Sequence, residues 1–500
     1  MIKRLLIANR GEIALRVIRA CRELAVETVA VYSDADVRAP HVAAADRAVR
    51  LGPPPATESY LAIPRVVEAA LASGADAVHP GYGFLSENAQ FASACERAGL
   101  TFVGPPSAVI ARMGSKIEAR RLAQEAGVPV VPGETPGDQS DEGLRRAIER
   151  VGLAALIKPS SGGGGKGMHR VHAPRDIADA VQTARREATA AFADGTLYVE
   201  RLLERPRHVE VQIFGDHHGH VVHLYERECS VQRRHQKVIE ETPSPGLTPA
   251  LRHRMTEAAV RVATAVGYRN AGTVEFLVDA AHGGADETPF YFLEMNTRLQ
   301  VEHPVSEAVV GVELVHAQLR VASGEPLPWA QSDLSQRGHA IEARVYAEDP
   351  AREFLPQAGR ILLYREPRLP GVRTDSGIAE GSEVPLEYDP LVAKVIACAE
   401  SRELARVRLI AALREFPILG LHTNVTFLLR ILEHERFRSG DTDTAFLEAE
   451  GPGLAAATTI EPPACVTAAI AAAGSGREVA SSRHESWDPW TRIRDWQRHE

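Results

Sequence analysis

The stretch KPSSGGGGKGM, residues 158–168, places four consecutive glycines between two lysines. Glycine loses more conformational freedom on ordering than any other residue, so a run of four is costly to hold in one shape. Backbone N–H groups that closely approach phosphate oxygens would offset that cost. A glycine run taken alone favours the alternative of an exposed surface loop. The rest of the chain has to separate these two interpretations.

Two known phosphate-binding motifs do not fit this stretch. A Walker A loop needs Ser or Thr after its lysine and a glycine six residues before it, but the chain has Gly167 and Ser160 at these positions. The pattern Gly-x-Gly-x-x-Gly does occur, at Gly162, Gly164 and Gly167. In a dinucleotide-binding fold that pattern joins a strand to a helix. Here β-favouring segments stand on both sides, so we predict a mobile flap between two strands.

Length and composition predict a protein of two to four domains without a nucleic-acid partner. The chain has 500 residues, of which 44% are hydrophobic, and a net charge of −9. Its five cysteines form no C-x-x-C pair, which favours reduced thiols over disulfides or a zinc site. Asn9 and Arg10 interrupt the first apolar run, so it is no signal peptide, and no run reaches the roughly 20 residues of a membrane span. We therefore expect a soluble, cytoplasmic protein.

Lysine is rare in this chain. Only six of the 57 basic residues are lysines, namely Lys3, Lys116, Lys158, Lys166, Lys237 and Lys394. A compact ammonium and a planar guanidinium are not interchangeable at phosphate sites, so lysines kept in an arginine-rich chain mark candidate anion sites. We apply this argument to the four central lysines. Lys3 and, with less reason, Lys394 are treated as chance survivals.

The N-terminal 115 residues predict a Rossmann-like parallel sheet. The apolar run at 5–8 predicts a buried strand, helical spacing follows up to residue 24, and 28–32 predict the next strand. Further β/α units end in the turns of HPGYGFLSEN and GLTFVGPP. Gly11 stands alone at the first turn, so dinucleotide binding is not expected there.

Three further portions follow. A helix in SKIEARRLAQEAG leads to a small β-rich unit, about 130–203, that holds the glycine flap, and polar strands follow it. A third portion, from HAIEARVYAEDP to about 447, mixes strands with the helix ELARVRLIAALREF. From about 450 the chain is rich in Gly, Ala and Pro and then polar, and it holds three of the four tryptophans.

A pair of acidic strands gives the strongest chemical signal. Glu275 in GTVEFLVD and Glu294 in FYFLEMN become near cross-strand partners in a symmetric hairpin, with Asn296 on the face of Glu294, unless a bulge shifts the register. Such oxygens repel one another unless a hard cation bridges them, and Mg²⁺ is the natural choice beside ATP phosphates. The alternative is a pair of solvent-facing acids, with Phe276 and Phe292 on the opposite face.

The segment NTRLQVEHPVSE directly follows these acids. An arginine beside a glutamate near a metal–nucleotide site can hold a small anion and remove its proton. Each polar residue taken alone is more simply a structural one, but together with the flap they form a specific constellation. Including VQRRHQKV, the candidates are Arg298, Gln300, Glu302, His303, His235 and Lys237.

Over about residues 1–447 the chain resembles biotin carboxylase, the ATP-grasp component of biotin-dependent carboxylases. The resemblance rests on the motifs IANRGEIA, HPGYGFLSEN, KPSSGGGGKGM, RHVEVQ, ECSVQRRHQKV, EMNTRLQVEHPV and EARVYAEDP, in this order. It implies an α/β and α+β multidomain fold. The implied parts are a Rossmann-like N-terminal domain (1–115), an ATP-grasp region (116–325) with a lid (130–203), a mixed α/β C-terminal domain (326–447) and a tail (448–500).

The resemblance also implies binding roles. ATP phosphates would meet Lys116 and Lys158 beneath the flap residues Gly163, Gly164, Gly165, Lys166 and Gly167, and the flap would be open without nucleotide and ordered with ATP. The adenosine pocket would comprise Glu200, Leu203, His208, Gln232, His235 and Leu277. Glu275, Glu294 and Asn296 would bind Mg²⁺ or Mn²⁺. Lys237, Arg298, Gln300, Val301 and Glu302 would bind bicarbonate.

The implied reaction is an ATP-dependent ligation. Glu302 would deprotonate bicarbonate, and the dianion would attack the γ-phosphate to give carboxyphosphate, which yields CO₂ and phosphate. The phosphate would then deprotonate biotin N1 while Arg344 stabilises the ureido oxygen. Tyr82 lies in a loop that the family places near biotin. The implied catalytic residues are Glu302, Arg298, Arg344 and Lys237.

The resemblance implies ATP, the metal ion and biotin as cofactors, and a homodimer. Biotin is expected on a separate biotin carboxyl carrier protein, because none of the six lysines follows a methionine and the chain continues only about fifty residues past its catalytic region. Streptavidin should therefore not detect this chain. A carboxyltransferase subunit is the other expected partner. The tryptophan-rich residues 484–500 are expected to dock in the holoenzyme or to pack on their own domain.

Other functions share part of these sequence features. An acetyl- or acyl-CoA carboxylase is the preferred context and a pyruvate carboxylase the alternative; the sequence does not identify the final carboxyl acceptor. A carbamoyl-phosphate synthetase normally carries two tandem copies of the ATP-grasp motifs, whereas this chain has one. A purine-pathway ligase lacks the segment QRRHQKV, which this chain contains. The context of the glycines excludes a NAD-dependent oxidoreductase. Bicarbonate-dependent ATPase activity with free biotin would separate the enzyme from an inactive nucleotide-binding scaffold.

Overall fold

The computed structural model describes residues 2–160, 167–192, 194–280 and 286–456. Residues 1–455 form one unit by their internal contacts. The flap residues Gly163, Gly164, Gly165 and Lys166 lie outside the described residues, as do residues 457–500. Within the described ranges no helix is long and apolar enough to cross a membrane.

The N-terminal residues form the predicted parallel sheet. Its strand order is β3-β2-β1-β4-β5, and every neighbouring pair is parallel. The apolar strands are buried because helices cover the sheet. The strands are β1 (Arg4–Ile7), β2 (Glu27–Ser33), β3 (Arg47–Gly52), β4 (Ala77–His79) and β5 (Thr101–Phe102). The helices are α1 (Gly11–Glu23), α2 (Pro40–Ala44), α3 (Ile63–Ser73), α4 (Ala89–Arg97) and α5 (Ser107–Gly114).

The loops that follow β1 and β4 are tied together. Asn9 Nδ2 donates to Pro80 O at 2.8 Å and to Tyr82 O at 2.7 Å. Gly81 has a φ of +62°, and a Cβ there would lie 2.8 Å from Asn9 Nδ2, so glycine is required. In a dinucleotide fold this is the point where the ligand binds. Here Asn9 instead fixes the loop that carries Tyr82.

The glycine stretch lies between two strands, as predicted, and these strands are antiparallel. β7 (Ala155–Pro159) pairs with β8 (His169–Val171) in a sheet of order β6-β9-β7-β8, with β6 (Gly133–Glu134) and β9 (Leu197–Arg201). α7 (Asp141–Val151) and α8 (Ile177–Phe192) contribute Leu144, Ile148 and Val181 to the core of this unit. α6 (Lys116–Glu125) precedes it.

An eight-stranded antiparallel sheet connects the ATP-grasp region to the C-terminal region. Its order is β14-β13-β10-β11-β12-β15-β22-β20. β12 pairs with β15 across the predicted boundary, with Ile239 opposite Ala343. The strands are β10 (Arg207–Gly215), β11 (Val221–Arg233), β12 (Gln236–Thr242), β13 (Asn270–Val278), β14 (Phe290–Asn296), β15 (His339–Tyr346), β20 (Val372–Ser376) and β22 (Leu391–Ala399).

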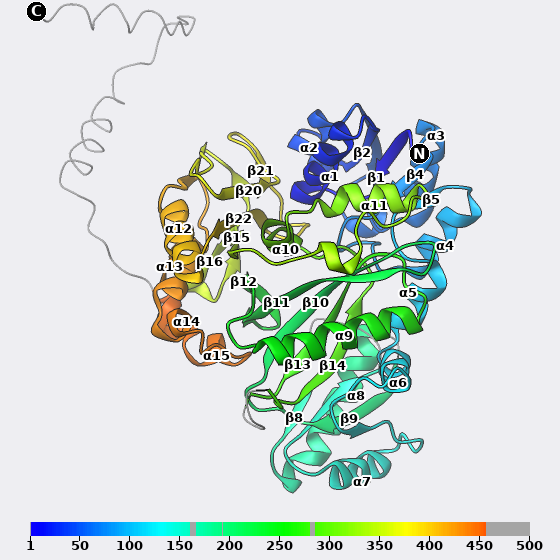
Figure 1. Cartoon of the computed structure of the whole chain (residues 1–500), viewed down its shortest axis with the longest axis vertical. Coiled ribbons are helices and arrows are strands. Elements are labelled where there is room, and N and C mark those ends of the chain that lie inside the picture. The colour runs from blue at the N-terminus through cyan, green and yellow to red at the C-terminus, as the bar shows by residue number, and fades with distance from the viewer. Residues whose placement is uncertain (1, 161–166, 193, 281–285, 457–500) are drawn as a thin grey trace, which may run out of the picture. The chain divides into compact units, whose positions relative to one another are not determined.

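Helices cover one face of each half of this sheet. Figure 1 shows α9 (Pro249–Ala265) lying across β10 and β13, where Met255 and Ala259 share a core with Val209 and Phe276. α12 (Arg402–Arg414) and α13 (Val425–Glu433) pack on β15 and β22. α10 (His303–Val310), which begins directly after Glu302, is followed by α11 (Leu314–Ala322).

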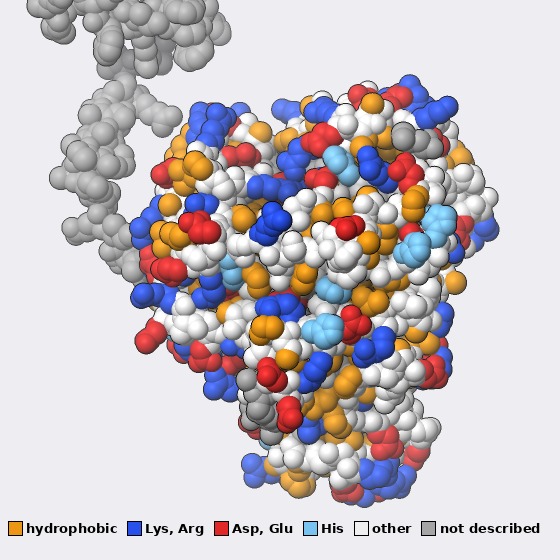
Figure 2. Space-filling model, viewed as in Figure 1, with side chains coloured by type: hydrophobic (Ala, Val, Ile, Leu, Met, Phe, Trp, Pro, Cys, Tyr) orange, Lys and Arg blue, Asp and Glu red, His pale blue; other side chains and the backbone are white. Residues whose placement is uncertain are grey.

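The remaining elements are short. The two-residue strands pair as β16 (Glu348–Asp349) with β17 (Leu355–Pro356), β18 (Gly359–Arg360) with β21 (Glu383–Val384), and β19 (Leu363–Tyr364) with β23 (Ile418–Leu419). The last helices are α14 (Glu435–Ser439), α15 (Phe446–Ala449) and α16 (Gly451–Ala455). On the face drawn in Figure 2, acidic and basic side chains are interspersed over the surface.

Successive side chains along β10 and β13 point to opposite faces of the sheet, and this alternation determines which residues reach the candidate site. Val209, Val274 and Phe276 turn one face of the sheet towards α9 and the apolar core. Their neighbours Glu210 and Glu275 turn to the other face, where they are also buried. Charged side chains are rarely buried without partners. The second face must therefore supply those partners itself.

Candidate active site

Lys237 on β12 lies at the centre of a buried group of carboxylates. Its Nζ is 2.6 Å from Glu302 Oε1 and 3.0 Å from Glu275 Oε1, and it also contacts Glu210. Burial disfavours the ammonium, but the carboxylates outweigh burial and raise the pKa of Lys237 well above its usual value. Lys237 therefore stays charged, as the binding of an anion requires.

Arg227 on β11 forms a buried ion pair with Glu210, one of these carboxylates. Its Nε donates to Glu210 Oε1 at 2.6 Å, and both side chains are fully buried. Its other nitrogens donate to Gln212, Thr273 and Ser306. Removing one member of a buried ion pair typically costs 3–5 kcal/mol, because it leaves a buried charge unpaired. Arg227 thus holds Glu210, and Glu210 holds Lys237.

Glu302 stands between two cations at the start of α10. Its side chain is fully buried, with Oε1 on Lys237 and Oε2 accepting from Arg344 Nη2 at 2.9 Å. Burial opposes its ionisation, but Lys237, Arg344 and Arg227 together hold the pKa of Glu302 well below its usual value. The carboxylate is therefore ionised, and its basicity depends on how tightly these cations are engaged.

Arg344 on β15 bridges two glutamates. Its Nε donates to Glu240 Oε1 at 2.6 Å while Nη2 contacts Glu302, and Asn424 Nδ2 donates to its backbone carbonyl at 3.0 Å. Glu240 Oε2 has no hydrogen-bond partner among the described residues. Burial, helped by the charge of Glu302 and opposed by Arg344, raises the pKa of Glu240 to about 7. The Arg344 guanidinium is thus oriented from both ends.

Arg298 extends the cluster towards the N-terminal sheet. Its Nη1 donates to Gln300 Oε1 at 2.8 Å and its Nη2 to Asn296 Oδ1 at 3.1 Å. Its Nε donates to Glu87 Oε2 at 3.0 Å, while Glu87 Oε1 accepts from the Thr297 N–H at 3.1 Å. Glu87 belongs to the motif HPGYGFLSEN, but sequence analysis gave it no role. It holds the arginine in place.

The two acidic strands pair as the sequence predicted. Glu275 lies opposite Glu294, with a register shift only after Glu275. Glu275 Oε1 accepts from Asn296 Nδ2 at 2.8 Å, but no hydrogen bond or ion pair is found for Glu294 among the described residues. Burial and the charge of Glu275 raise the pKa of Glu294, although Lys116 opposes them. A hard divalent cation would relieve this repulsion, so the donor set of Glu275, Glu294 and Asn296 fits Mg²⁺ or Mn²⁺.

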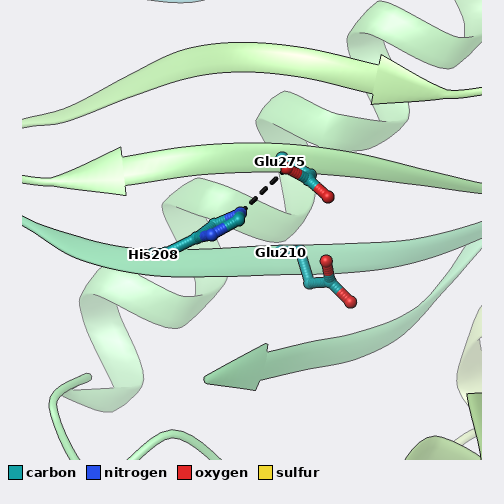
Figure 3. Close-up of side chains that lie close together, drawn as sticks. All are labelled: His208, Glu210 and Glu275. Atoms are coloured by element: carbon teal, nitrogen blue, oxygen red, sulfur yellow. Dashed lines mark hydrogen bonds and ion pairs between the residues drawn. The ribbon is translucent and has the colours of Figure 1, made fainter. Parts of the chain in front are cut away.

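His208, Glu210 and Glu275 form a second acidic group. Their ligand atoms lie within 4.8 Å of one another. Figure 3 shows His208 on β10 pointing across to Glu275 on β13, and its Nε2 is 2.9 Å from Glu275 Oε2. Glu210 is already paired with Arg227 and Lys237. Neighbouring cations therefore neutralise the carboxylates of this group, whereas Glu294 has no ion pair among the described residues.

Two of the predicted phosphate lysines differ in their surroundings. Lys158 on β7 is buried in an ion pair with Glu200, and Arg120 Nη1 lies 3.4 Å from the same carboxylate. Burial lowers the pKa of Lys116, with Lys158 adding to the effect and Glu294 opposing it. Glu200 therefore compensates the charge of Lys158 and raises its pKa, whereas Lys116 has no ion pair among the described residues. An anionic phosphate would stabilise the Lys116 ammonium.

Three family models match consecutive parts of the chain. "Biotin carboxylase, N-terminal domain" matches residues 1–110, "Carbamoyl-phosphate synthase L chain, ATP binding domain" matches 115–330, and "Biotin carboxylase C-terminal domain" matches 342–449. The biotin carboxylase of Halalkalibacterium halodurans is 50% identical over 447 residues, which are 89% of this chain and 97% of that protein. The chain belongs to the biotin carboxylase family.

Two other similarities set this member of the family in context. The α subunit of a mitochondrial methylcrotonoyl-CoA carboxylase from Oryza sativa is 54% identical over 448 residues, 89% of this chain but only 60% of that relative. The biotin carboxylase domain dimer of Hydrogenobacter thermophilus 2-oxoglutarate carboxylase, solved with MgADP, ADP and bicarbonate, has a TM-score of 0.87 and 42% identity. It covers 92% of this chain and 99% of the solved chain.

The other predicted ligand-binding residues lie on neighbouring strands or in the loops beside them. His208 pairs with Leu277 across β10 and β13, and Gln232 with Lys237 across β11 and β12. Leu203 is half-buried after β9, and burial, helped by Arg170 and Lys158, lowers the pKa of His235. Gly167, the described end of the flap, has a φ of +74°. The hydroxyl of Tyr82 is buried without a hydrogen-bond partner among the described residues.

One lysine had been wrongly set aside. Lys394 is fully buried, and its Nζ donates to Val301 O at 2.7 Å. The interpretation of this lysine as a chance survival is therefore wrong, because a fully buried ammonium needs the partners that Glu12 and the Val301 carbonyl supply here. Sequence analysis also gave no role to Glu210, Arg227 and Glu240. Their chemistry depends on strand pairing that no local pattern reveals.

Proposed function

We propose that the chain catalyses the ATP-dependent carboxylation of biotin with bicarbonate, through carboxyphosphate. The observation that carries this proposal is the buried carboxylate of Glu302 held between Lys237 and Arg344, with Arg298 close by. A base surrounded by cations is suited to a substrate that is itself an anion carrying an acidic proton. The bicarbonate bound in the H. thermophilus relative supports the same assignment.

In the first step this cluster would hold and deprotonate bicarbonate. Lys237, Arg298, Gln300 and the backbone of Val301 bind the anion, and Glu302 takes its proton. The resulting carbonate attacks the γ-phosphorus of ATP, the bond to the β-phosphate oxygen breaks, and ADP leaves. The products are carboxyphosphate, ADP and a protonated Glu302.

Binding would also activate the base. In the free protein Lys237 and Arg344 hold the pKa of Glu302 low. A bicarbonate ion shares these cations, and the neighbouring ATP phosphates add negative charge, so the pKa of Glu302 rises towards that of a useful base. Basicity therefore increases only when substrate is present. This order of events protects ATP from premature reaction with water.

The nucleotide and the metal ion would lie beside this cluster. Lys116, Lys158 and the flap would contact phosphates, while Glu200, Leu203, His208, Gln232, His235 and Leu277 would line the adenosine pocket. Glu275, Glu294 and Asn296 would hold Mg²⁺ or Mn²⁺, which neutralises phosphate charge when bound. The MgADP in the H. thermophilus relative supports this placement.

The second step would transfer CO₂ to biotin. Carboxyphosphate breaks into CO₂ and phosphate, and the phosphate removes the proton from biotin N1. The nitrogen then attacks the carbon of CO₂. Arg344 stabilises the negative charge on the ureido oxygen. The Tyr82 hydroxyl, which has no hydrogen-bond partner within the described ranges, offers a further polar contact.

We further propose that the chain acts in a biotin-dependent acyl-CoA carboxylase, as a homodimer working with a carrier-borne biotin and a carboxyltransferase. The methylcrotonoyl-CoA carboxylase relative supports the acyl-CoA context, and the dimeric H. thermophilus structure supports the dimer. Carboxylase complexes purified through this chain should carboxylate an acyl-CoA. Carboxylation of pyruvate instead would overturn the acyl-CoA assignment.

The proposed reaction is tested directly by following ADP release. With Mg-ATP, release should require bicarbonate and increase with free biotin, and radiolabelled bicarbonate should enter an acid-labile product. The matched control is Glu302→Gln, which keeps the shape of the side chain. A rate of ADP release that depends on neither bicarbonate nor biotin would overturn the proposal.

A further inference from the structure

Lys394 lies where three parts of the chain meet. It is on β22, and its side chain is completely buried. Its Nζ lies 3.2 Å from Glu12 on α1 and 3.9 Å from Asp375 on β20, and the Tyr82 ring centroid is 6.0 Å away. The Nζ also donates the 2.7 Å hydrogen bond to the Val301 carbonyl. A single ammonium therefore links the N-terminal sheet, the C-terminal sheet and the segment that precedes Glu302.

Among these contacts of Lys394, the one to the Val301 carbonyl has the geometry of a hydrogen bond, whereas those to Glu12 and Asp375 are ion pairs. Neither carboxylate oxygen of Glu12 has an aligned hydrogen bond among the described residues, although the ion pair is short. Asp375 is held instead by Arg373, at 2.7 and 3.0 Å. The two acids thus balance the charge of Lys394, while its N–H points at the Val301 carbonyl. That carbonyl belongs to the same peptide group as the N–H of Glu302.

The sheet places Lys394 beside the site. It pairs with Arg344 across β15 and β22 and with Asp375 across β20 and β22. Arg344 contacts the carboxylate of Glu302, whereas Lys394 contacts the backbone immediately before it. Neighbouring strand positions therefore hold the base by its side chain and by its main chain. An error of about 1 Å in such a group can cost about 100-fold in rate.

We propose that Lys394 is a positioning residue that fixes the Val301–Glu302 peptide, so that bicarbonate and the carboxylate of Glu302 meet in reacting geometry. The inference rests on the proposed function of Glu302, but its structural part does not. A lysine suits the position because a compact ammonium fits an enclosed space that the larger guanidinium would overfill. In a chain with 51 arginines, 57 basic residues less six lysines, this choice of residue has a physical reason.

The test compares three substitutions at this position. Lys394→Met removes both charge and donor, Lys394→Gln keeps an N–H donor for the Val301 carbonyl, and Lys394→Arg keeps the charge in a larger group. We expect Lys394→Met to lower kcat/KM for bicarbonate by about 10- to 100-fold, with the KM for ATP nearly unchanged. Lys394→Gln should recover more of this loss than Lys394→Arg. Lys3→Met, at an exposed position, is the matched control.

A second readout does not depend on activity. Hydrogen exchange of the amides at 297–303, measured without ligands, should be faster in Lys394→Met than in the wild type and slower again in Lys394→Gln. If the wild type shows no bicarbonate-dependent ADP release, the proposed function fails and this measurement still decides the role of Lys394. Unchanged exchange in a folded Lys394→Met protein overturns the inference, as do unchanged bicarbonate kinetics.

A double variant tests the inference even if Lys394→Met alone does not fold. Lys394→Met leaves Glu12 buried without its cation, which is destabilising. Lys394→Met/Glu12→Gln removes both charges, while Met and Gln keep side chains of about the same length as those they replace. This double variant should show the same defect towards bicarbonate and the same fast exchange at 297–303. Wild-type behaviour of the double variant would show that Lys394 serves only to neutralise Glu12, which overturns the inference.

Discussion

Glu302 and Lys237 form a buried ion pair, with Glu302 Oε1 2.6 Å from Lys237 Nζ. The two residues are 65 positions apart in the chain and meet because α10 begins beside β12. In the free protein each neutralises the other. We propose that bicarbonate enters this pair, taking Lys237 as its cation and Glu302 as its base.

Glu302→Gln should lower bicarbonate-dependent ADP release by about 10²–10⁴-fold, because the amide cannot accept the proton. Binding of Mg-ATP should stay near the wild-type value, because Glu302 is not among the residues proposed to contact the ATP phosphates. Steady-state kinetics and calorimetric nucleotide titration measure the two effects. A variant that keeps more than half of the wild-type turnover would remove Glu302 from the role of base.

Glu87→Gln should raise the KM for bicarbonate by about 3- to 10-fold, a loss of roughly 1 kcal/mol. The amide keeps a contact with Arg298 but not the charge that orients it, and Glu87 is 42% exposed, which limits the effect. The KM for ATP should not move. Glu58→Gln, at another exposed glutamate, is the control. Equal KM values for bicarbonate in both variants would contradict the role of Glu87.

Glu294→Gln should increase the concentration of Mg²⁺ needed for half-maximal activity by about 10-fold or more, because an amide is a weaker ligand than a carboxylate. Replacing this acid also removes its repulsion from Glu275, so the variant should be at least as stable as the wild type without metal. Metal titration of activity and thermal unfolding in EDTA test the two parts. A lower midpoint of unfolding in EDTA would show that the repulsion is not real.

Glu348→Gln should become more stabilising as the pH rises. Burial, against the opposing charge of Arg233, raises the pKa of Glu348 to about 7. The unfolded chain therefore loses this proton at a lower pH than the folded protein does. As the pH rises from about 4.5 to 7, the free energy of unfolding falls, and the loss is complete above the folded pKa. Glutamine removes that penalty, which is about 1–3 kcal/mol at pH 8. Thermal unfolding of both proteins at pH 5.5 and 8.5 measures the difference, and a constant difference would refute it.

Much of the architecture was predictable because its signals are local. The alternation in GTVEFLVD and FYFLEMN placed Glu275 opposite Glu294, and the β-favouring flanks of the glycines indicated a loop between two strands. The parallel N-terminal sheet followed from buried strands alternating with helical spacing. Long motifs in a fixed order then indicated the family. Periodicity and motif spacing are properties of short segments, which the sequence displays directly.

What holds the site together was decided by tertiary structure. Glu87 is 211 residues from Arg298, and Lys394 is 93 residues from Val301. Sequence patterns assign a residue to a strand and a face, but not to the strands that will lie beside it. Whether a buried charge is neutralised depends on those neighbours, and Coulomb energies in a low-dielectric interior are decided over a few ångströms. For this reason the sequence indicated the residues proposed to bind the substrates, whereas only the fold revealed the residues that orient them.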